Sequence, residues 1–166
     1  MTKFKLNNQL IGHGCQPFII AEAGINHNGE IKNALEMVDV AKDAGANAIK
    51  FQTFEASGIV TDLSLTYTYK SQEKEITESM FEMFKRCELS KAEWIEIKQK
   101  CDESNISFLS TPENRSDLDL LLELGIPAIK VGSDDFTNIP LLKDYSTTRL
   151  PLIISCGMSN LSEIQQ

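Results

Sequence analysis

The stretch Phe18-Ile-Ile-Ala-Glu-Ala-Gly-Ile-Asn-His-Asn-Gly29 decides the fold. Its apolar, β-prone opening, residues 18–21, is typical of a buried strand. An acid, Glu22, follows where that strand should end, and the polar segment 24–29 holds two glycines suited to a turn with positive φ. Strand, polar turn and helix form the unit of α/β enzymes, whose chemistry gathers at the carboxyl ends of strands. A plain connection with an exposed acid is the alternative for this stretch taken alone.

A helix is predicted directly after this turn. Apolar residues recur at helical spacing and form one stripe along it, and Gly45 is a C′ glycine that ends it. The stripe consists of Ile31, Ala34, Leu35, Val38 and Ala41.

The same alternation of strand and helix continues along the chain. Further strands are predicted over 48–53, 106–112, 128–133 and 152–157. Between them lie helical patterns around residues 80–84, 90–101, 116–125 and 141–145, and another helix begins near residue 159. Residues 3–12 indicate a small hairpin that could close one end of a barrel. Residues 54–78 are predicted to be a surface loop, either a binding loop or plain solvated surface.

Five strand–helix steps without a dinucleotide-binding glycine pattern fit an open doubly wound sheet or a (β/α)8 TIM barrel. Every predicted strand ends in polar, hydrogen-bonding residues, whereas a doubly wound sheet concentrates its ligand groups at one switch point. The sequence therefore favours the α/β barrel. Since five strands cannot close one, we expect residues 1–166 to be the incomplete N-terminal portion of a barrel domain, with about three strands missing.

The composition excludes some classes of protein. Apolar residues make up 42% and charged residues 24% of the chain, as in soluble globular proteins. A net charge of -8 argues against binding nucleic acid, which requires a basic surface. Four scattered cysteines without a C-x-x-C pair indicate reduced thiols in a cytoplasmic protein. We find no signal peptide and no apolar run long enough to cross a membrane.

Polar side chains in and after the strands predict a shared site at the barrel mouth. Two lysines within buried strands need anionic partners, because an unpaired charge in a core is costly. Together with several hydroxyls they suit a phosphate or carboxylate, while the acids suit proton transfer. Two alternatives stay open: Lys130 forms a Schiff base, or Lys50 or Lys130 makes only a structural ion pair with Glu22. His27 alone predicts no metal site. The candidate residues are Glu22, Lys50, Gln52, Ser110, Thr111, Lys130, Ser133, Asp135 and Ser155.

Five motifs taken in order resemble the bacterial sialic acid synthase family, the N-acetylneuraminate synthases with their legionaminate and pseudaminate relatives. The motifs are Ile20-Ala-Glu-Ala-Gly-Ile-Asn-His-Asn-Gly29, Ile49-Lys-Phe-Gln-Thr53, Ser110-Thr-Pro112, Ile129-Lys-Val-Gly-Ser133 and Ile154-Ser-Cys-Gly-Met158. Each motif is weak alone, but the set is specific and the resemblance extends from about residue 4 to 166.

The resemblance implies a transferase of surface polysaccharide biosynthesis that condenses phosphoenolpyruvate with an N-acylated hexosamine, such as N-acetylmannosamine, and releases phosphate. It also implies a divalent cation, Mn²⁺ or Mg²⁺, and a homodimer at full length. By motif, Glu22 and Asp135 would serve water addition or proton transfer, and Gln52 would contact the sugar. The residues implied to bind phosphoenolpyruvate are Lys50, Thr111, Lys130, Ser133 and Ser155.

The chain departs from the family pattern in two ways. Asp135 stands where the family has glutamate, and Asp134 stands where it often has glycine. The family's two metal-binding histidines and its C-terminal antifreeze-like domain would lie beyond residue 166. We therefore expect no metal ligand in this chain and no activity from it alone. A non-catalytic half-barrel that binds an anion or pairs with another chain is the alternative.

Overall fold

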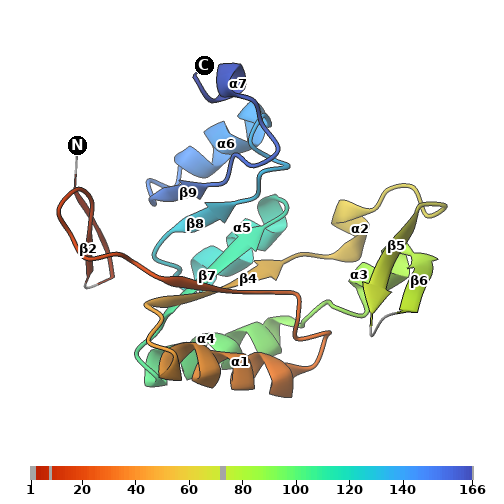
Figure 1. Ribbon diagram of the computed structural model, residues 1–166, viewed down its shortest axis with the longest axis horizontal. Coiled ribbons are helices and arrows are strands. Elements are labelled where there is room, and N and C mark those ends of the chain that lie inside the picture. Colours follow the sequence, from red (N-terminus) through yellow and green to blue (C-terminus); the bar gives the residue numbers. More distant parts are fainter. Residues whose placement is uncertain (1–2, 8, 72–73, 166) are drawn as a thin grey trace.

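The computed structural model describes residues 3–7, 9–71 and 74–165 (Figure 1). Three strands, β3 (Ile20–Gly24), β4 (Ala48–Thr53) and β7 (Ser107–Pro112), form a parallel sheet in that order. Beside β7 lies β8 (Ile129–Val131), which pairs in parallel with β9 (Leu152–Ile154). These parallel strands lie side by side in the order of the chain, with helices between them and no reversal of strand order, so the predicted class is confirmed: the fold is part of a (β/α)8 barrel.

Helices follow each parallel strand and cover its outer side. They are α1 (Ile31–Asp43) after β3, α4 (Lys91–Glu103) before β7, α5 (Arg115–Glu123) before β8, α6 (Ile139–Ser146) before β9 and the short α7 (Leu161–Ile164) after β9. As predicted, α1 buries Ala34, Val38 and Ala41 and is followed by Gly45, with a φ of 80°. Helix α4 begins with the capping box of Ser90 and Glu93, which satisfies exposed backbone N–H groups at its start.

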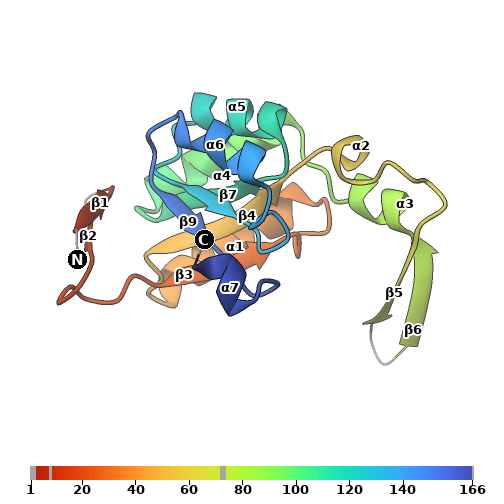
Figure 2. The ribbon, with the colours of Figure 1, turned by 90° about the horizontal axis from the view of Figure 1, so that it is seen from above.

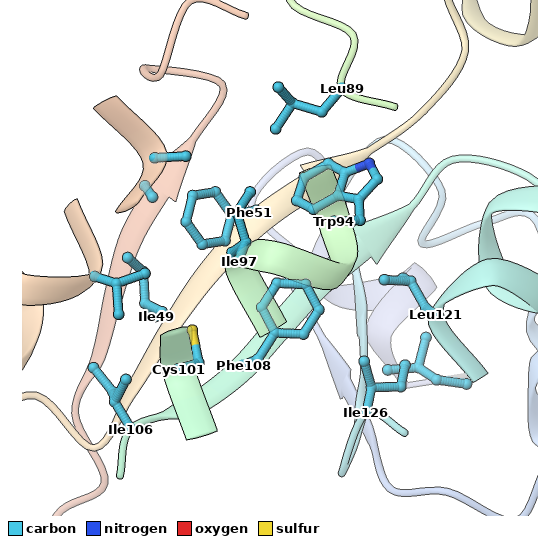
Figure 3. Close-up of a cluster of buried hydrophobic side chains, with 14 of the residues drawn as sticks. Ile49, Phe51, Leu89, Trp94, Ile97, Cys101, Ile106, Phe108, Leu121 and Ile126 are labelled. Atoms are coloured by element: carbon cyan, nitrogen blue, oxygen red, sulfur yellow. The ribbon is translucent and has the colours of Figure 1, made fainter. Parts of the chain in front are cut away.

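The main core lies between the strands and the helices (Figure 3). Phe51 of β4 meets Trp94 of α4 edge to face, with ring centroids 5.9 Å apart, and Phe108 of β7 joins both rings. Burial of each such aromatic side chain stabilises the fold by about 2–3 kcal/mol. Against Phe51 and Trp94 also lies His27, which is fully buried. Its Nδ1 accepts a hydrogen bond from the backbone N–H of Gly29, so His27 is a packing residue of the turn.

A second, smaller core lies on the opposite face of the strands. It contains Leu6, Ala48, Leu109 and Ala128. Leu6 comes from the hairpin of β1 (Phe4–Leu6) and β2 (Gln9–Ile11), which confirms the hairpin predicted over residues 3–12; Asn8 lies outside the described residues. Since Ala48 begins β4 and Ala128 precedes β8, the hairpin places Leu6 toward the amino-terminal ends of the strands, away from the mouth.

The segment 54–78 differs from its prediction as a loop. It contains a short helix, α2 (Ala56–Ile59), and the antiparallel strands β5 (Thr66–Ser71) and β6 (Lys74–Ser79); residues 72–73 lie outside the described part. The hairpin stands away from the barrel strands (Figure 2). Alternating threonine and tyrosine in β5 favours a strand, and Thr68 and Thr77 hydrogen bond across the pair at 2.8 Å. After α3 (Met80–Lys85), Arg86 anchors the hairpin through Glu78.

Two strands are shorter than predicted. β8 ends at Val131 and β9 at Ile154, whereas residues up to 133 and 157 were expected. At Gly132 the carboxylate of Asp134 folds back over the backbone, because a Cβ there would lie 2.1 Å from Asp134 Oδ1. The chain therefore leaves the strand direction at the glycine, and Ser133 and Ser155 follow their strands instead of ending them.

Candidate functional site

Alternation along the strands decides which side chains face the mouth. Successive strand residues point to opposite faces. In β4, Ala48 belongs to the inner core and Ile49 and Phe51 to the helix side, so Lys50 and Gln52 face inward. In each of the other strands, the site residue stands two positions after a residue of the inner core and therefore points to the same face. This places Glu22 of β3, Thr111 of β7, Lys130 of β8 and Ser155 after β9 on the inner face.

Ser110 is a correction to the predicted set. Leu109 faces the inner core, so Ser110 points toward the helices. There its buried hydroxyl lies 2.7 Å from Thr53 Oγ1, which also leaves the inner face. Adjacent strand residues cannot both face the mouth, and Thr111 is the one that does.

Lys50 lies at the centre of the first group of site residues. Its Nζ is 3.0 Å from Glu22 Oε1 and donates to Thr111 Oγ1 at 3.2 Å. The Lys50 side chain is 8% exposed and that of Glu22 60%, so the lysine is inside and the carboxylate is at the rim. The ion pair between Lys50 and Glu22, predicted as an alternative, therefore exists. Because the Glu22 carboxylate is exposed, a ligand can reach the pair from the mouth.

Lys130 forms the second group. Its Nζ donates to Ser155 Oγ at 2.7 Å and to the carbonyl oxygen of Val131. Within the described residues it makes no ion pair with a carboxylate. Burial, and then the nearby charge of Lys50, lower the pKa of Lys130. Two lysines close enough to influence each other, one of them without a carboxylate partner among the described residues, have the charge that suits an anion.

Gln52 belongs to a third, acidic group that includes one residue the sequence reasoning missed. Gln52 Nε2 donates to Glu113 Oε1 across 3.4 Å. Burial raises the pKa of Glu113 to about 7, and the carboxylates of Asp134 and Asp135 add to this effect. Glu113 follows β7 two residues after Thr111, so alternation along the strand was the signal that could have found it.

The remaining predicted residues follow β8. Ser133 and Asp135 are half-buried, and Asp135 Oδ1 accepts a hydrogen bond from Asn138 Nδ2 at 3.0 Å. Asn138 is also the N-cap of α6, since its side chain accepts from the Leu141 N–H at 3.3 Å. Asp135 is thus tied to the start of α6 by one oxygen, and its other oxygen makes no hydrogen bond within the described part of the chain.

No group of three or more His, Cys, Asp or Glu side chains that could hold a metal ion occurs in residues 3–7, 9–71 and 74–165. Over the same residues, no helix has the length and apolar character needed to cross a membrane. The four cysteines are free thiols.

Comparison with known proteins agrees with this geometry. The model of the NeuB family matches residues 37–166. The chain belongs to the NeuB family. It is 38% identical over 148 residues to the N,N'-diacetyllegionaminic acid synthase of Legionella pneumophila, across 89% of this chain and 42% of that protein. It is 32% identical over 154 residues to the N-acetylneuraminate-9-phosphate synthase of Homo sapiens, across 93% of this chain and 42% of that protein.

A solved structure of the same kind has a closely similar fold. The N-acetylneuraminic acid synthetase of Leptospira borgpetersenii serovar Hardjo-bovis superposes with a TM-score of 0.85 and 35% identity, over 99% of this chain and 53% of that one. This NeuB family chain thus spans about half the length of its relatives.

Proposed function

We propose that this NeuB family chain carries the phosphoenolpyruvate-binding part of a sialic acid-type synthase, which condenses phosphoenolpyruvate with an N-acylated hexosamine. One observation carries the proposal: Lys50 and Lys130 lie on one inner face, and Lys130 has no carboxylate partner among the described residues. Phosphoenolpyruvate brings a phosphate and a carboxylate, which together suit two cations. The names of the relatives, which are synthases of sialic acid-type sugars, support the same reaction class.

Each inner-face group has a distinct task in this proposal. Lys50, Thr111, Lys130, Ser133 and Ser155 hold the anion. C3 of the bound phosphoenolpyruvate then attacks the open-chain aldehyde of the sugar, forming the new C–C bond. Water adds at C2, and the tetrahedral intermediate loses phosphate by C–O cleavage. Glu22 at the rim and Asp135 after β8 accept or supply the protons of water addition, as positioned carboxylates do. Gln52 contacts the sugar.

Several wider properties belong to the proposal. The proposed reaction takes a divalent cation, Mn²⁺ or Mg²⁺, for which the described residues offer no group of three or more His, Cys, Asp or Glu side chains. We place the protein in the cytoplasm, which the four free cysteines support. We also propose a homodimer at full length and a role in surface polysaccharide synthesis.

Phosphorus-31 NMR tests the proposal because one spectrum reports both the binding of phosphoenolpyruvate and the release of inorganic phosphate. Phosphoenolpyruvate is mixed with the 166-residue chain and Mg²⁺, with and without N-acetylmannosamine. We expect the phosphoenolpyruvate resonance to broaden with the chain, and to broaden less with the Lys130→Met variant. Inorganic phosphate that forms only when the sugar is present would support the full reaction. Absence of broadening, or release of phosphate that ignores the sugar, would contradict the proposal.

A Schiff-base aldolase is the second candidate, because the pKa of Lys130 is lowered by burial and by Lys50. Such a lysine is a better nucleophile toward carbonyls than an ordinary one. Borohydride reduction in the presence of pyruvate separates the two candidates. A stable adduct on Lys130, found by peptide mass spectrometry, would favour the aldolase, whereas an unmodified Lys130 favours the synthase.

A further inference from the structure

One titratable group in the mouth has no role in the proposed reaction, the carboxyl group of Glu113. Its backbone is held on two sides. The Glu113 N–H donates to the carbonyl oxygen of Thr53 at 3.3 Å, and the preceding carbonyl, that of Pro112, accepts from the Tyr145 hydroxyl at 3.1 Å. Tyr145 is fully buried on α6. Glu113 is therefore fixed by β4 and α6 before any ligand arrives.

The neighbour of Glu113 is the carboxamide of Gln52, whose two ends meet different surroundings. Its Nε2 faces Glu113 Oε1. Its Oε1 faces Gly24, where a Cβ would lie 3.4 Å from Gln52 Oε1 and equally far from Glu22 Oε1. With a φ of 55°, Gly24 brings no side chain to this point, which also lies 4.0 Å from Asn26 Nδ2, so the oxygen of the half-buried Gln52 carboxamide lies beside the backbone at the carboxyl end of β3.

A carboxamide has nearly the same shape after a 180° flip, so its neighbours decide its orientation. An ionised carboxylate accepts hydrogen bonds and donates none. Beside Glu113, the NH2 end of Gln52 is the favoured end, and the oxygen is left toward Gly24.

We propose that Glu113 is a positioning residue of this site, which orients the Gln52 carboxamide so that its oxygen is presented to the ligand. A carboxamide oxygen accepts hydrogen bonds, so the ligand group at this point is a donor, a hydroxyl or an amide N–H. An N-acylated sugar carries both. This identification of the donor rests on the proposed function, whereas the orientation of Gln52 by Glu113 does not.

The orientation depends on pH. Burial and neighbouring carboxylates raise the pKa of Glu113 to about 7. A protonated Glu113 can donate to the oxygen end of Gln52, so the preference for one orientation is lost as the pH falls through that range. The charged and titratable groups around Glu113 come from several elements and comprise Asp117 on α5, Asp134 and Asp135 after β8, Lys130 on β8 and Tyr145 on α6.

Side-chain NMR tests the proposal on the 166-residue chain. The ¹⁵N–¹H resonances of the Gln52 carboxamide are followed from pH 5 to 8.5. We expect their chemical shifts to change with a midpoint at pH about 7, the pKa of Glu113. The Glu113→Gln variant should abolish this shift, and Glu113→Asp, which keeps the charge, should retain part of it. Gln52 resonances that do not move with pH, or that move equally in Glu113→Gln, would overturn the proposal.

The chain offers a matched control. On the surface of α4, Gln99 Nε2 donates to Glu103 Oε1 at 2.8 Å, which makes a second Gln–Glu pair, exposed on a helix instead of at the strand ends. The Glu103→Gln variant should leave the Gln52 titration unchanged. A change there as large as that in Glu113→Gln would show that the shift reports general charge and would also overturn the proposal.

Ligand binding separates this inference from the proposed function. With Glu113→Gln, we expect phosphoenolpyruvate affinity to stay within about twofold and N-acetylmannosamine affinity to fall roughly tenfold, as for the loss of one oriented hydrogen bond. Absence of phosphoenolpyruvate binding to the unmodified chain would contradict the proposed function, while the Gln52 titration would still stand. Equal loss of both affinities would contradict a role of Glu113 limited to Gln52.

Discussion

At the scale of single residues, the fold holds several ionisable side chains in or near the mouth whose charged forms lack an oppositely charged partner. Lys130 donates to a hydroxyl and a carbonyl oxygen, and its pKa is lowered because burial and Lys50 disfavour its charged form. Burial likewise favours the neutral form of the Glu113 and Asp117 carboxyl groups, and for these acids it raises the pKa. Such groups are typical of functional sites, where ligand binding supplies the missing partner.

Binding of an anion should return a proton to Lys130. An anion beside Nζ favours the charged form, so it raises the lowered pKa, and the free lysine takes up a proton when the ligand binds. We expect net proton uptake when phosphoenolpyruvate binds at alkaline pH, measured by calorimetry in buffers of different ionisation enthalpy. The Lys130→Met variant should show no such uptake, and proton release by the unmodified chain would contradict the assignment.

The contributions of Glu113 and Asp117 to stability should fall as the pH rises above 5, whereas that of His27, whose pKa is lowered by burial, changes in the opposite direction. The pKa of Glu113 is raised to about 7 and that of Asp117 to about 6, in both cases first by burial. The folded chain therefore holds protons that the unfolded chain has released, and this stabilisation is lost as the pH rises through the folded pKa values. After allowance for partial solvent screening, Glu113 accounts for on the order of 2 kcal/mol. Urea unfolding at pH 5 and 8 measures the change, which Glu113→Gln should reduce.

At the scale of elements, the turn between β3 and α1 is coupled to the connection between α3 and α4. Gly29 has a φ of 77°, and a Cβ there would lie 1.9 Å from the carbonyl oxygen of Arg86. Only glycine allows the two backbones to approach this closely. The approach joins the turn that follows Glu22 to the segment that begins α4.

Two glycine substitutions distinguish the cost of an unfavourable backbone conformation from the cost of a steric clash with neighbouring backbone. Gly45 has a similar φ of 80° but no atom within 4 Å of its Cβ position. Gly45→Ala should cost about 1–2 kcal/mol of unfolding free energy, the strain of a left-handed residue. Gly29→Ala should lower the unfolding free energy by more, since the backbone at Arg86 must also move away from the new Cβ. Denaturant unfolding compares the two variants, and equal costs would show that the contact with Arg86 is unimportant.

The elements that the sequence predicted well are those with local patterns. The strand 48–53 and the helix from Ile31 follow directly from an apolar run and a helical stripe. The hairpin of β5 and β6 was missed because its polar threonines and charges resemble a loop, although they alternate. Ser110 ends a predicted strand as Thr111 does, but the alternation of side chains along β7 directs it to the helix side. The raised pKa of Glu113 depends on burial and on Asp134 and Asp135, which lie about twenty residues further along the chain, so it could not be predicted from the local segment.

At the scale of the whole molecule, the parallel strands leave two open edges. In the described part of the chain β3 pairs with β4 alone and β9 with β8 alone. Beside β3 lies a cavity of about 480 Å³ whose lining includes Met37 and Val40, and Val40 is 62% exposed. Unpaired strand edges and exposed apolar surface promote association.

The 166-residue chain should therefore associate in solution. We expect light scattering to give a mass above the 18.5 kDa of one chain, increasing with concentration. Val40→Lys, which puts a charge beside the β3 edge, should lower the measured mass. A stable monomer at all concentrations would contradict this expectation.

The central claim is that the inner face of these strands binds phosphoenolpyruvate through its two lysines. Isothermal titration of phosphoenolpyruvate into the unmodified chain tests it most directly, beside Lys130→Met and the control Lys143→Met, which removes an exposed lysine of α6. Loss of a charged hydrogen-bonding partner costs about 2 kcal/mol. The account predicts saturable binding, weakened roughly thirtyfold by Lys130→Met and unchanged by Lys143→Met. Absence of binding, or equal weakening by both variants, would contradict it.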